Sequence, residues 1–265
     1  MGVNINMNIL PIDSSNINFK TCARRYSPKN IKQQGIFGES IIRTSTNIFR
    51  EDIDWLEFTD FIVHHFLPKA NVNIHSLACS DGSEPYSLAI CFLKKIPKTG
   101  LNKYLPIEAS DIDSEMIKTA KSGRLNLADF ELDYYDNSKF IMRDFFKQQS
   151  DALVIDNDKL GINPTHSYEP ISELKKSVKF HVGDMLGELN NLKDEGNSVI
   201  MCRNVFPYLS KTYSDNILQT LDNKLKSGSI VVTGSFDERA DIINRMLSFN
   251  FFNPINGSPN IFQKK

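Results

Sequence analysis

The chain has 265 residues, with 31 Lys and Arg against 32 Asp and Glu, so its formal charge is −1. Hydrophobic residues make up 40% and charged residues 24%, which is typical of globular proteins and excludes a disordered acidic or basic tail. The balanced charge argues against a dedicated nucleic-acid binder, and no apolar run is long enough to span or insert into a membrane. The length fits one large domain with at most a small appendage.

Residues 1–43 are rich in Asn, Ser and Lys and lack periodicity, so we expect a loosely structured arm with a short helix around Asn30–Gln34. The arm is locally basic. The simplest interpretation is a solvated lead-in segment, and a docking surface for an acidic partner is the alternative. The arm shows neither the basic start nor the apolar stretch of a secretory signal. Four scattered cysteines without metal-ligand spacing predict reduced thiols, no metal site and a cytoplasmic location: Cys22, Cys79, Cys91 and Cys202.

The first half of the chain has the pattern of a βαβ unit. Apolar spacing predicts a helix over Glu51–Phe66, which Pro68 helps to end. Next come a strand, a tight turn, a helix, a strand and a helix, predicted at Asn73–Ala78, Cys79–Ser83, Glu84–Lys95, Leu105–Ser110 and Ser114–Lys121. Such an order predicts parallel strands joined by a right-handed crossover.

The alternation stops between Gly123 and Lys176, a polar stretch in which only a small hairpin, Ala152–Ile155 with Lys159–Ile162, is indicated. It then resumes with strands at Val178–Val182, Ser198–Cys202 and Ser229–Gly234, helices at Asp215–Leu225 and Asp237–Leu247, and a terminal hairpin of Phe249–Phe252 and Asn260–Gln263 around Asn256-Gly257. We therefore predict an α/β fold with a doubly wound, mostly parallel, Rossmann-like sheet. Residues 1–67 would form an N-terminal arm and helix, residues 68–265 the main domain, and residues 124–177 an inserted subdomain.

Three predicted loops fall at the carboxyl edge of this sheet, where open parallel sheets bind ligands. In the first, Gly82 allows close backbone approach and the following helix start offers free N–H groups, although an ordinary βα loop is about as good an interpretation. In the second, Asp111 suits a pair of ribose hydroxyls, while Asp113 suits the cap of the next helix. The third presents three polar groups after an apolar strand: Arg203, Asn204 and Tyr208.

A nucleoside in this cleft would be a nicotinamide cofactor or S-adenosylmethionine. The sequence lacks the glycine triplet that cradles a pyrophosphate, which counts against a dinucleotide. S-adenosylmethionine carries no phosphate and needs only one close-approach glycine, so it is the favoured cofactor.

Five segments resemble motifs of the chemotaxis-receptor methyltransferases, the CheR family, and occur in the family's order. They are Thr44–Arg50, Leu77–Ala89, Ala109–Gly123, Cys202–Tyr208 and Leu225–Gly234. The resemblance implies S-adenosylmethionine-dependent methyl esterification of glutamate side chains on the cytoplasmic coiled coil of a chemoreceptor, with S-adenosylhomocysteine as product. By position it implies cofactor contacts from Thr44, Thr46, Arg50, Glu84, Asp111, Asp184, Met185, Arg203 and Asn204.

The chemistry that the resemblance implies is a displacement at a methyl group by a carboxylate. Because the carboxylate is already anionic at neutral pH, we expect neither a general base nor a metal. Arg50 suits the task of holding a carboxylate of substrate or cofactor, and Tyr208 that of orienting the attacking oxygen. Two alternatives remain: a methyltransferase of the same fold with another substrate, and a non-catalytic S-adenosylmethionine-binding signalling module.

Overall fold

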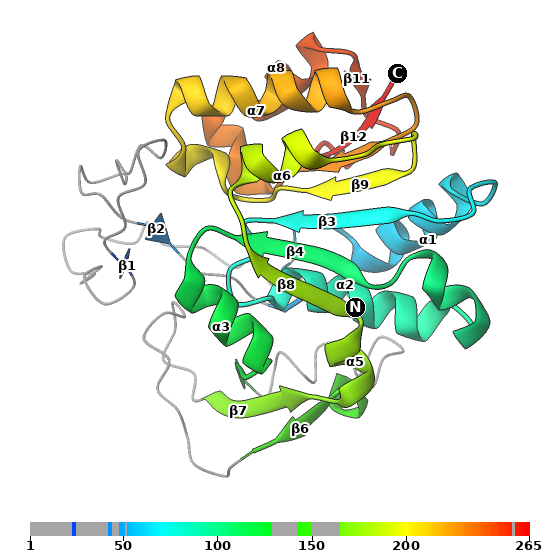
Figure 1. Cartoon of the computed structure of the whole chain (residues 1–265), viewed down its shortest axis with the longest axis vertical. Coiled ribbons are helices and arrows are strands. Elements are labelled where there is room, and N and C mark those ends of the chain that lie inside the picture. Colours follow the sequence, from blue (N-terminus) through cyan, green and yellow to red (C-terminus); the bar gives the residue numbers. More distant parts are fainter. Residues whose placement is uncertain are drawn as a thin grey trace, which may run out of the picture.

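The computed structural model describes residues 23–24, 42–43, 48–50, 52–128, 142–149, 165–255 and 258–265. Its centre is a seven-stranded sheet with the order β11-β12-β10-β9-β3-β4-β8 (Figure 1). The strands are β3 (Asn73–Leu77), β4 (Ile107–Asp111), β8 (Val178–Val182), β9 (Ser198–Met201), β10 (Ile230–Val232), β11 (Phe251–Phe252) and β12 (Ile261–Lys264). From β10 to β8 all neighbours are parallel, whereas β12 is antiparallel to both β10 and β11.

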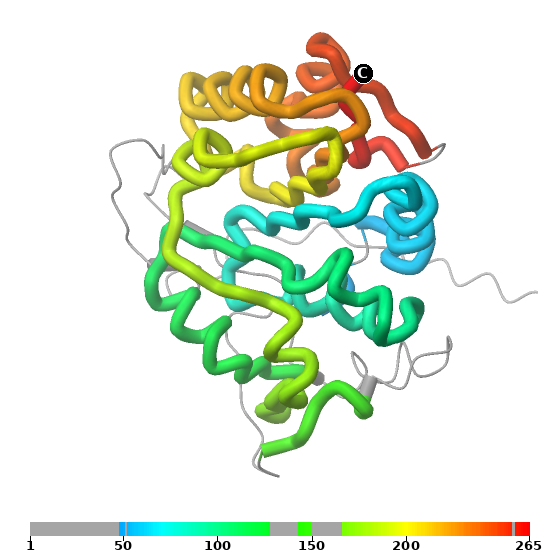
Figure 2. The backbone as a smooth tube through the Cα atoms, turned by 45° about the vertical axis from the view of Figure 1, so that its right-hand side comes forward, coloured from blue at the N-terminus to red at the C-terminus, as the bar shows by residue number. Residues whose placement is uncertain are grey.

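The strand order reverses direction at β3. From there the chain builds β4 and β8 on one side of the sheet, and then β9, β10 and the terminal strands on the other. Figure 2 shows this path, with cyan segments in the middle, green ones toward one end, and orange and red ones toward the other. Such a reversal is the place where doubly wound sheets open a ligand crevice.

Helices cover both faces of the sheet. The helices are α1 (Trp55–His65), α2 (Ser83–Lys95), α3 (Ser114–Ser122), α5 (Ser172–Lys176), α6 (Met185–Asn191), α7 (Lys211–Lys224) and α8 (Ile242–Ser248). Two separate apolar clusters form the core: one buries α1, α2 and α3 against the sheet, and the other buries α6, α7 and α8. The predicted doubly wound α/β fold is therefore confirmed.

Capping residues explain where two helices start. The Asp54 carboxylate accepts from the backbone N–H groups of Leu56 and Glu57, both at 2.9 Å, so α1 begins at Trp55 rather than at the predicted Glu51. Ser210 caps α7 in the same way, so that this helix begins at Lys211, four residues before its predicted start. Asp52 is thereby left outside the helix, where it contacts the loops after β9 and β10.

The predicted helix Asp237–Leu247 is wrong in one respect, because it is two elements: the 3₁₀ helix η5 (Ser235–Ala240) and α8. Asp241 separates them with a left-handed φ of 55°. The short helix α6 escaped prediction, because only Met185 and Leu189 of its residues are buried and two positions give no periodicity. Strands β11 and β12 form the expected antiparallel pair, although its Asn256-Gly257 turn lies outside the described residues.

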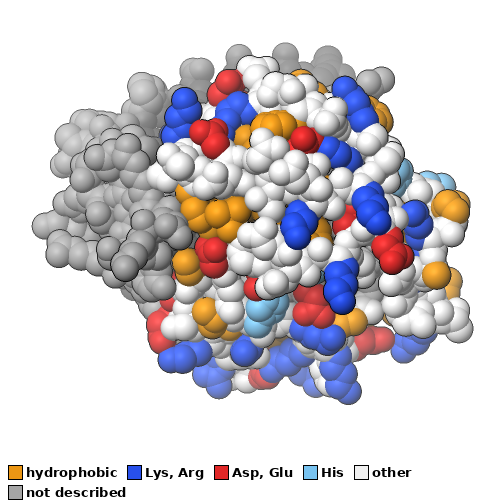
Figure 3. All heavy atoms as spheres, turned by 45° about the horizontal axis from the view of Figure 1, so that its top comes forward, with side chains coloured by type: hydrophobic (Ala, Val, Ile, Leu, Met, Phe, Trp, Pro, Cys, Tyr) orange, Lys and Arg blue, Asp and Glu red, His pale blue; other side chains and the backbone are white. Residues whose placement is uncertain are grey.

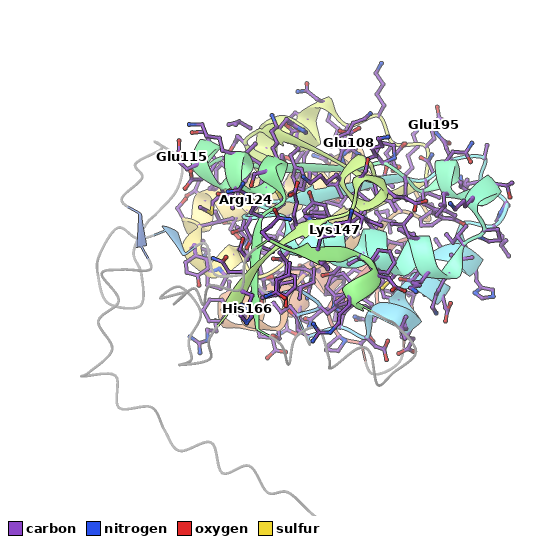
Figure 4. The ribbon with its side chains drawn as sticks, turned by 90° about the horizontal axis from the view of Figure 1, so that it is seen from below. Glu108, Glu115, Arg124, Lys147, His166 and Glu195 are labelled. Atoms are coloured by element: carbon purple, nitrogen blue, oxygen red, sulfur yellow. The ribbon has the colours of Figure 1, made fainter. Side chains whose placement is uncertain are left out.

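The insertion contains a small antiparallel sheet of order β5-β7-β6, made of Leu125–Ala128, Thr165–Pro170 and Phe146–Gln148. Figure 4 shows it from below, with Lys147 and His166 on this sheet and Arg124 directly before β5. Its inward side chains Leu125, Leu127, Phe146 and Tyr168 are buried in the α2 side of the core. The small sheet therefore packs as part of the main core, although the predicted hairpin at 152–162 lies outside the described residues.

Other described segments add little to the site. Strands β1 (Ala23–Arg24) and β2 (Ile42–Arg43) pair antiparallel, and the predicted helix around Asn30–Gln34 falls outside the described residues. Cys79, Cys91 and Cys202 are buried free thiols, as predicted for those three. Among the helices that the structure describes, none combines the length and apolarity that crossing a membrane requires.

Candidate functional site

Backbone strain is concentrated at the carboxyl edge of the sheet. Of the five described non-glycine residues with left-handed φ, four follow or adjoin this edge: Phe49, Ala78, Ser80 and Asn204, with φ between 49° and 58°. Non-glycine residues adopt this conformation only where surrounding contacts impose it, and such positions cluster at ligand sites. The strain therefore marks the same edge that the sequence predicted.

Asp111, at the end of β4, holds the first strained loop in place. Its Oδ2 accepts from the backbone N–H of Ser80 at 2.8 Å, and its Oδ1 accepts from that of Asp113 at 2.8 Å. Asp113 in turn caps α3 by accepting from the N–H groups of Glu115 and Met116, which confirms its expected capping role. Burial raises the pKa of Asp111, and its backbone hydrogen bonds oppose that rise. The Asp111 carboxylate thus braces the β3 and β4 loops, with its ribose-binding role still a prediction.

Replacing Asp111 by asparagine should weaken S-adenosylmethionine binding by about ten- to a hundredfold, since charged hydrogen bonds are worth ~1.5–3 kcal/mol. Calorimetric titration of the folded variant measures this directly. Asp113→Ala is the matched control, because it should lose about 1 kcal/mol of stability through the helix cap and keep its cofactor affinity. Equal affinities in wild type and Asp111→Asn would leave Asp111 with a bracing role alone.

Gly82 is needed for the turn between β3 and α2 and also for the packing of the side chains beside it. It precedes α2 with φ of 90°, and a Cβ there would lie 2.8 Å from Cζ of Phe180 and 3.2 Å from the Ala120 methyl group. A side chain at this position would therefore displace the Phe180 ring, which stacks edge-on against Tyr86. The glycine is required by the chain's own packing, and its role in admitting a ligand remains a prediction.

A buried ionic network lies beneath the strained loops. The Arg203 side chain is only 1% exposed and forms ion pairs with Asp52 and with Glu84, the latter at 3.2 Å. Its guanidinium carbon lies 4.8 Å from the centre of the Trp55 ring. The second oxygen of Glu84 accepts from the Ser76 hydroxyl at 2.7 Å. The network therefore ties α1, α2, β3 and the β9 loop together at one point.

Burial shifts the pKa values of both partners in the ion pair between Glu84 and Arg203. It raises the pKa of Glu84 to about 7, although the Ser76 hydrogen bond and the charge of Arg50 both lower it. Burial, followed by the positive charge of Arg50, lowers the pKa of Arg203 to about 9. The two arginines therefore lie within electrostatic range of one another and of Glu84.

Glu84 should make stability depend on pH. Its folded pKa of about 7 lies above the ordinary 4.5, so between these values the native state holds a proton that the unfolded chain has released. The free energy of unfolding should therefore fall as pH rises through this window, and Glu84→Gln should remove that part of the decline. Urea titrations across the window measure the slope. The exposed Glu57→Gln should keep the wild-type slope, and an unchanged slope in Glu84→Gln would contradict the assignment.

The loops after β9 and β10 are locked together by Asp237, which is fully buried. Its carboxylate accepts from the backbone N–H groups of Asn204 at 2.7 Å, Phe206 at 3.0 Å and Gly234 at 2.8 Å. The Asn204 side chain donates to Asp52 at 3.0 Å, and a Cβ on Gly234 would overlap its amide. Burial raises the pKa of Asp237 to about 6. The strained Asn204 backbone is thus imposed by neighbours on two loops.

Asp52 and Asp237 are site residues that sequence reasoning missed. Asp237 stands three residues after Gly234, the spacing of an acid that bonds back to the start of a turn, and this signal could have found it. Asp52 carries no local pattern, because its partners are more than 150 positions away. Only the folded chain reveals its role.

Arg50 is held at the edge by its neighbours. The preceding Ile48 and Phe49 are buried, and the Phe49 N–H donates to Ser87 Oγ on α2 at 2.8 Å. The Arg50 carbonyl accepts from the Trp55 indole N–H at 3.0 Å. Its own side chain is partly exposed and forms no ion pair with any residue that the structure describes. Thr44 and Thr46, predicted to act with it, lie outside the described residues.

The other predicted residues are more enclosed. Asp184 caps α6 through the N–H of Gly187, and its second oxygen accepts from the Tyr213 hydroxyl. Met185 is buried in the core cluster on the α7 side. Tyr208 is partly buried in the 3₁₀ helix η4 (Phe206–Tyr208) and stacks on Phe236 with ring centres 5.7 Å apart. Apart from Arg50, which precedes α1, the fold therefore places the described candidates at the ends of β3, β4, β8 and β9 or in the loops and helix starts that follow them.

The donor set fits S-adenosylmethionine. Arg203 Nε is buried without a hydrogen-bond partner among the residues that the structure describes, and a buried donor without a partner is uncommon. Together with the cation of Arg50 it suits the carboxylate of the methionine part. Asp111 supplies an acceptor for hydroxyl groups, and the loops contain no run of glycines for a phosphate.

Comparison with known families agrees with this chemistry. A family profile described as "CheR methyltransferase, SAM binding domain" matches residues 44–248. The chain belongs to the CheR methyltransferase family. The matched part is the family's domain for S-adenosylmethionine, the cofactor that the donor set fits.

Curated relatives are named as methyltransferases, and two of the three that follow as chemotaxis methyltransferases. "Chemotaxis protein methyltransferase 2" of Vibrio cholerae is 26% identical over 70% of this chain and 58% of its own length. "Chemotaxis protein methyltransferase" of Listeria innocua is 23% identical over 64% of this chain and 55% of its own. Another relative, "Probable biofilm formation methyltransferase WspC" of Pseudomonas aeruginosa, is 22% identical over 62% of this chain and 33% of its own. The chain thus spans little more than half of the first two relatives.

Solved structures with detectable similarity include a TehB-like SAM-dependent methyltransferase from Corynebacterium glutamicum. It has 11% identity and a TM-score of 0.38 and covers 77% of this chain and 84% of that one. Magnesium protoporphyrin IX methyltransferase from Synechocystis has 12% identity and a TM-score of 0.39 over 79% of both chains.

Proposed function

We propose that this chain transfers the methyl group of S-adenosylmethionine to glutamate side-chain carboxylates of a chemotaxis receptor, giving methyl esters. Membership of the CheR family and the names of its relatives support this activity. The structural observation that carries it is Arg50, a cation anchored at the carboxyl edge without a described anionic partner. The acceptor would be the cytoplasmic part of the receptor, so the reaction would take place in the cytoplasm.

The residues at the edge suit an acceptor that is already ionised. The loop segments 78–82, 112–113, 202–205 and 233–236 contain no histidine. Cys79 and Cys202 are buried, and burial raises the pKa of both thiols well above the ordinary value, so neither is a ready nucleophile. A glutamate carboxylate needs no base at neutral pH. Catalysis by this chain would therefore consist of holding and orienting two reactants.

Each residue has a positioning task in this scheme. When bound, S-adenosylmethionine supplies an electrophilic methyl group on a sulfonium centre. Arg50 would hold a carboxylate through its planar fork, which a lysine cannot reproduce. Asp111 would accept ribose hydroxyls, and Asp184 would accept from the adenine amino group. The Arg203 network beneath them would keep these groups in fixed relative positions.

Transfer of tritiated methyl groups tests the proposal. The full chain, tritiated S-adenosylmethionine and a receptor cytoplasmic fragment should give label that base releases as volatile methanol. Base-stable label alone would indicate a methyltransferase with another substrate, and cofactor binding without transfer would indicate a signalling module. Either outcome contradicts the proposal. Arg50→Lys should lower transfer by about tenfold or more at unchanged thermal stability, whereas the exposed Lys118→Arg on α3 should behave as wild type.

Tyr208 offers a sharper test of the orienting role. Tyr208→Phe keeps the ring that stacks on Phe236 and removes the hydroxyl. Cofactor affinity should stay the same, while kcat should fall by the equivalent of ~1–3 kcal/mol if the hydroxyl bonds the acceptor in the transition state. Single-turnover rates at saturating cofactor measure this. Tyr104→Phe, which removes a hydroxyl beside Phe92, is the control, and equal rates for all three proteins would remove Tyr208 from the site.

A further inference from the structure

A groove of about 850 Å³ opens beside η4 and η5, between these 3₁₀ helices and the helices α7 and α8. Its lining includes Tyr208, the residue predicted to orient the acceptor, and none of the residues predicted to bind the cofactor. The groove therefore shares Tyr208 with the predicted site and includes no predicted cofactor residue in its lining. Its volume exceeds what one glutamate side chain needs and is in the range of sites for larger ligands.

The groove combines stacked rings with basic side chains. Tyr208 stacks on Phe236, and the guanidinium of Arg239 lies 4.5 Å from the centre of the Phe236 ring. Arg239 and Lys211 are both exposed, and neither forms an ion pair with another described residue. All four of these side chains line the groove.

The acids of the groove already have partners. Asp215 pairs with Arg245, and Asp241 accepts from the side-chain amide of Asn244 at 2.7 Å. The start of the fourteen-residue helix α7 also faces this region, since Leu209 and Lys211 line the groove. Free N–H groups at a helix start add positive potential. The lining therefore holds three cations, Lys211, Arg239 and Arg245, against two carboxylates, and Lys211 and Arg239 have no ion-pair partner among the described residues.

On the face shown in Figure 3, basic and acidic side chains are interspersed, with small apolar patches between them. The chain's own N-terminal arm does not complement the groove, because residues 20–43 contain six basic residues and one acid. Charge complementarity favours an acidic segment of another protein.

We infer that this groove binds an acidic segment of the acceptor protein that flanks the methylated glutamate. The inference rests on the proposed function and adds to it the place where the acceptor lies and the residues that select it. Lys211 and Arg239 pair with acidic side chains of the segment, while the Tyr208 and Phe236 rings pack against its apolar stems. Docking there brings the reacting carboxylate to Tyr208.

Binding of a fluorescein-labelled, glutamate-rich receptor peptide, followed by anisotropy with the full chain, tests the inference. Arg239→Glu and Lys211→Glu should each weaken binding by about tenfold, with the loss shrinking as salt rises. Lys118→Glu, on α3, reverses an exposed charge outside the groove and should bind as wild type. A peptide with glutamine in place of glutamate should bind weakly to every variant.

The cofactor provides an internal control, because calorimetric affinity for S-adenosylmethionine should be the same in all these proteins. Peptide binding that is unchanged in Arg239→Glu and Lys211→Glu, or weakened equally in Lys118→Glu, would overturn the inference. Methyl transfer with an unchanged KM in the groove variants would overturn it while leaving the proposed function intact. Groove-dependent peptide binding without any base-labile transfer would instead uphold the groove and overturn the proposed function.

Discussion

Replacing Arg203 by methionine should lower the free energy of unfolding by about 3–5 kcal/mol, the usual cost of breaking a buried ion pair from one side. Methionine keeps most of the volume and loses the charge that serves both Asp52 and Glu84. Because the Asp52 side chain is only 5% exposed and its carboxylate is committed to this network, the variant would retain carboxylates without their cation. Contact with the Trp55 ring would also weaken.

Urea unfolding of matched variants shows whether the stability loss comes from the buried Arg203 network or follows the removal of any arginine. Arg203→Lys keeps the charge but cannot span two carboxylates with one planar group, so its loss should be intermediate. Arg245→Met removes a more exposed pair with Asp215 and should cost about 1 kcal/mol or less. Equal losses in Arg203→Met and Arg245→Met would contradict the central place of Arg203. Raising the pH above 7 should enlarge the loss in Arg203→Met, because Glu84 is then ionised.

Local patterns were enough to predict the frame of the fold. The β3–α2–β4 unit was found within one or two residues at each end, since alternating apolar residues, a glycine turn and a proline near the helix start all lie within a few positions. The apolar runs of β9 and β10 were equally clear, because strands buried on both faces leave no polar positions. These elements decide where the carboxyl edge lies, and hence where Asp111 and Arg203 emerge.

The features that the sequence did not predict depend on contacts between residues far apart in the chain. Asp52 is a site residue through partners contributed by the loops after β9 and β10, and nothing beside it in the sequence predicts those partners. The break at Asp241 was missed because apolar spacing continues across it, while the fold draws Asp237 inward to serve another loop. The small sheet has strands of three to six residues, separated by long stretches of chain, so no single window showed alternation.

The predicted site residues show the same contrast between local patterns, which the sequence reveals, and long-range contacts, which it does not. Arg203 and Asn204 were placed at the edge correctly, yet the structure shows that they are also the structural junction of four segments. Asp184 was singled out as a cofactor contact, and its bond to Tyr213, 29 positions later, was invisible in the sequence. A residue that is predicted to bind a ligand and is seen to brace the fold has to meet both demands. Substitutions at such residues must be compared with control substitutions that alter only the contacts within the fold.

Asp237→Asn should destabilise the chain by about 2–4 kcal/mol, because the amide NH₂ would face backbone N–H groups that now donate to a carboxylate, leaving buried donors unpaired. The substitution keeps the size of the side chain, so packing stays the same. The donors belong to Asn204, Phe206 and Gly234, which fix the loop that carries Arg203 and the turn that carries Tyr208. Methyl transfer should therefore fall along with stability.

Asp241→Asn is the matched control for this substitution. Asp241 lies four residues away, is exposed, and has the left-handed φ that asparagine also tolerates, so stability should change by less than about 0.5 kcal/mol. Urea unfolding gives the stability of each variant, and single-turnover transfer below the unfolding transition gives the activity of the folded fraction. A folded Asp237→Asn fraction with wild-type transfer would show that Asp237 stabilises the β9 and β10 loops without setting the geometry of the site. Reduced transfer in the folded fraction, with wild-type transfer in Asp241→Asn, would show that this one carboxylate positions both Arg203 and Tyr208.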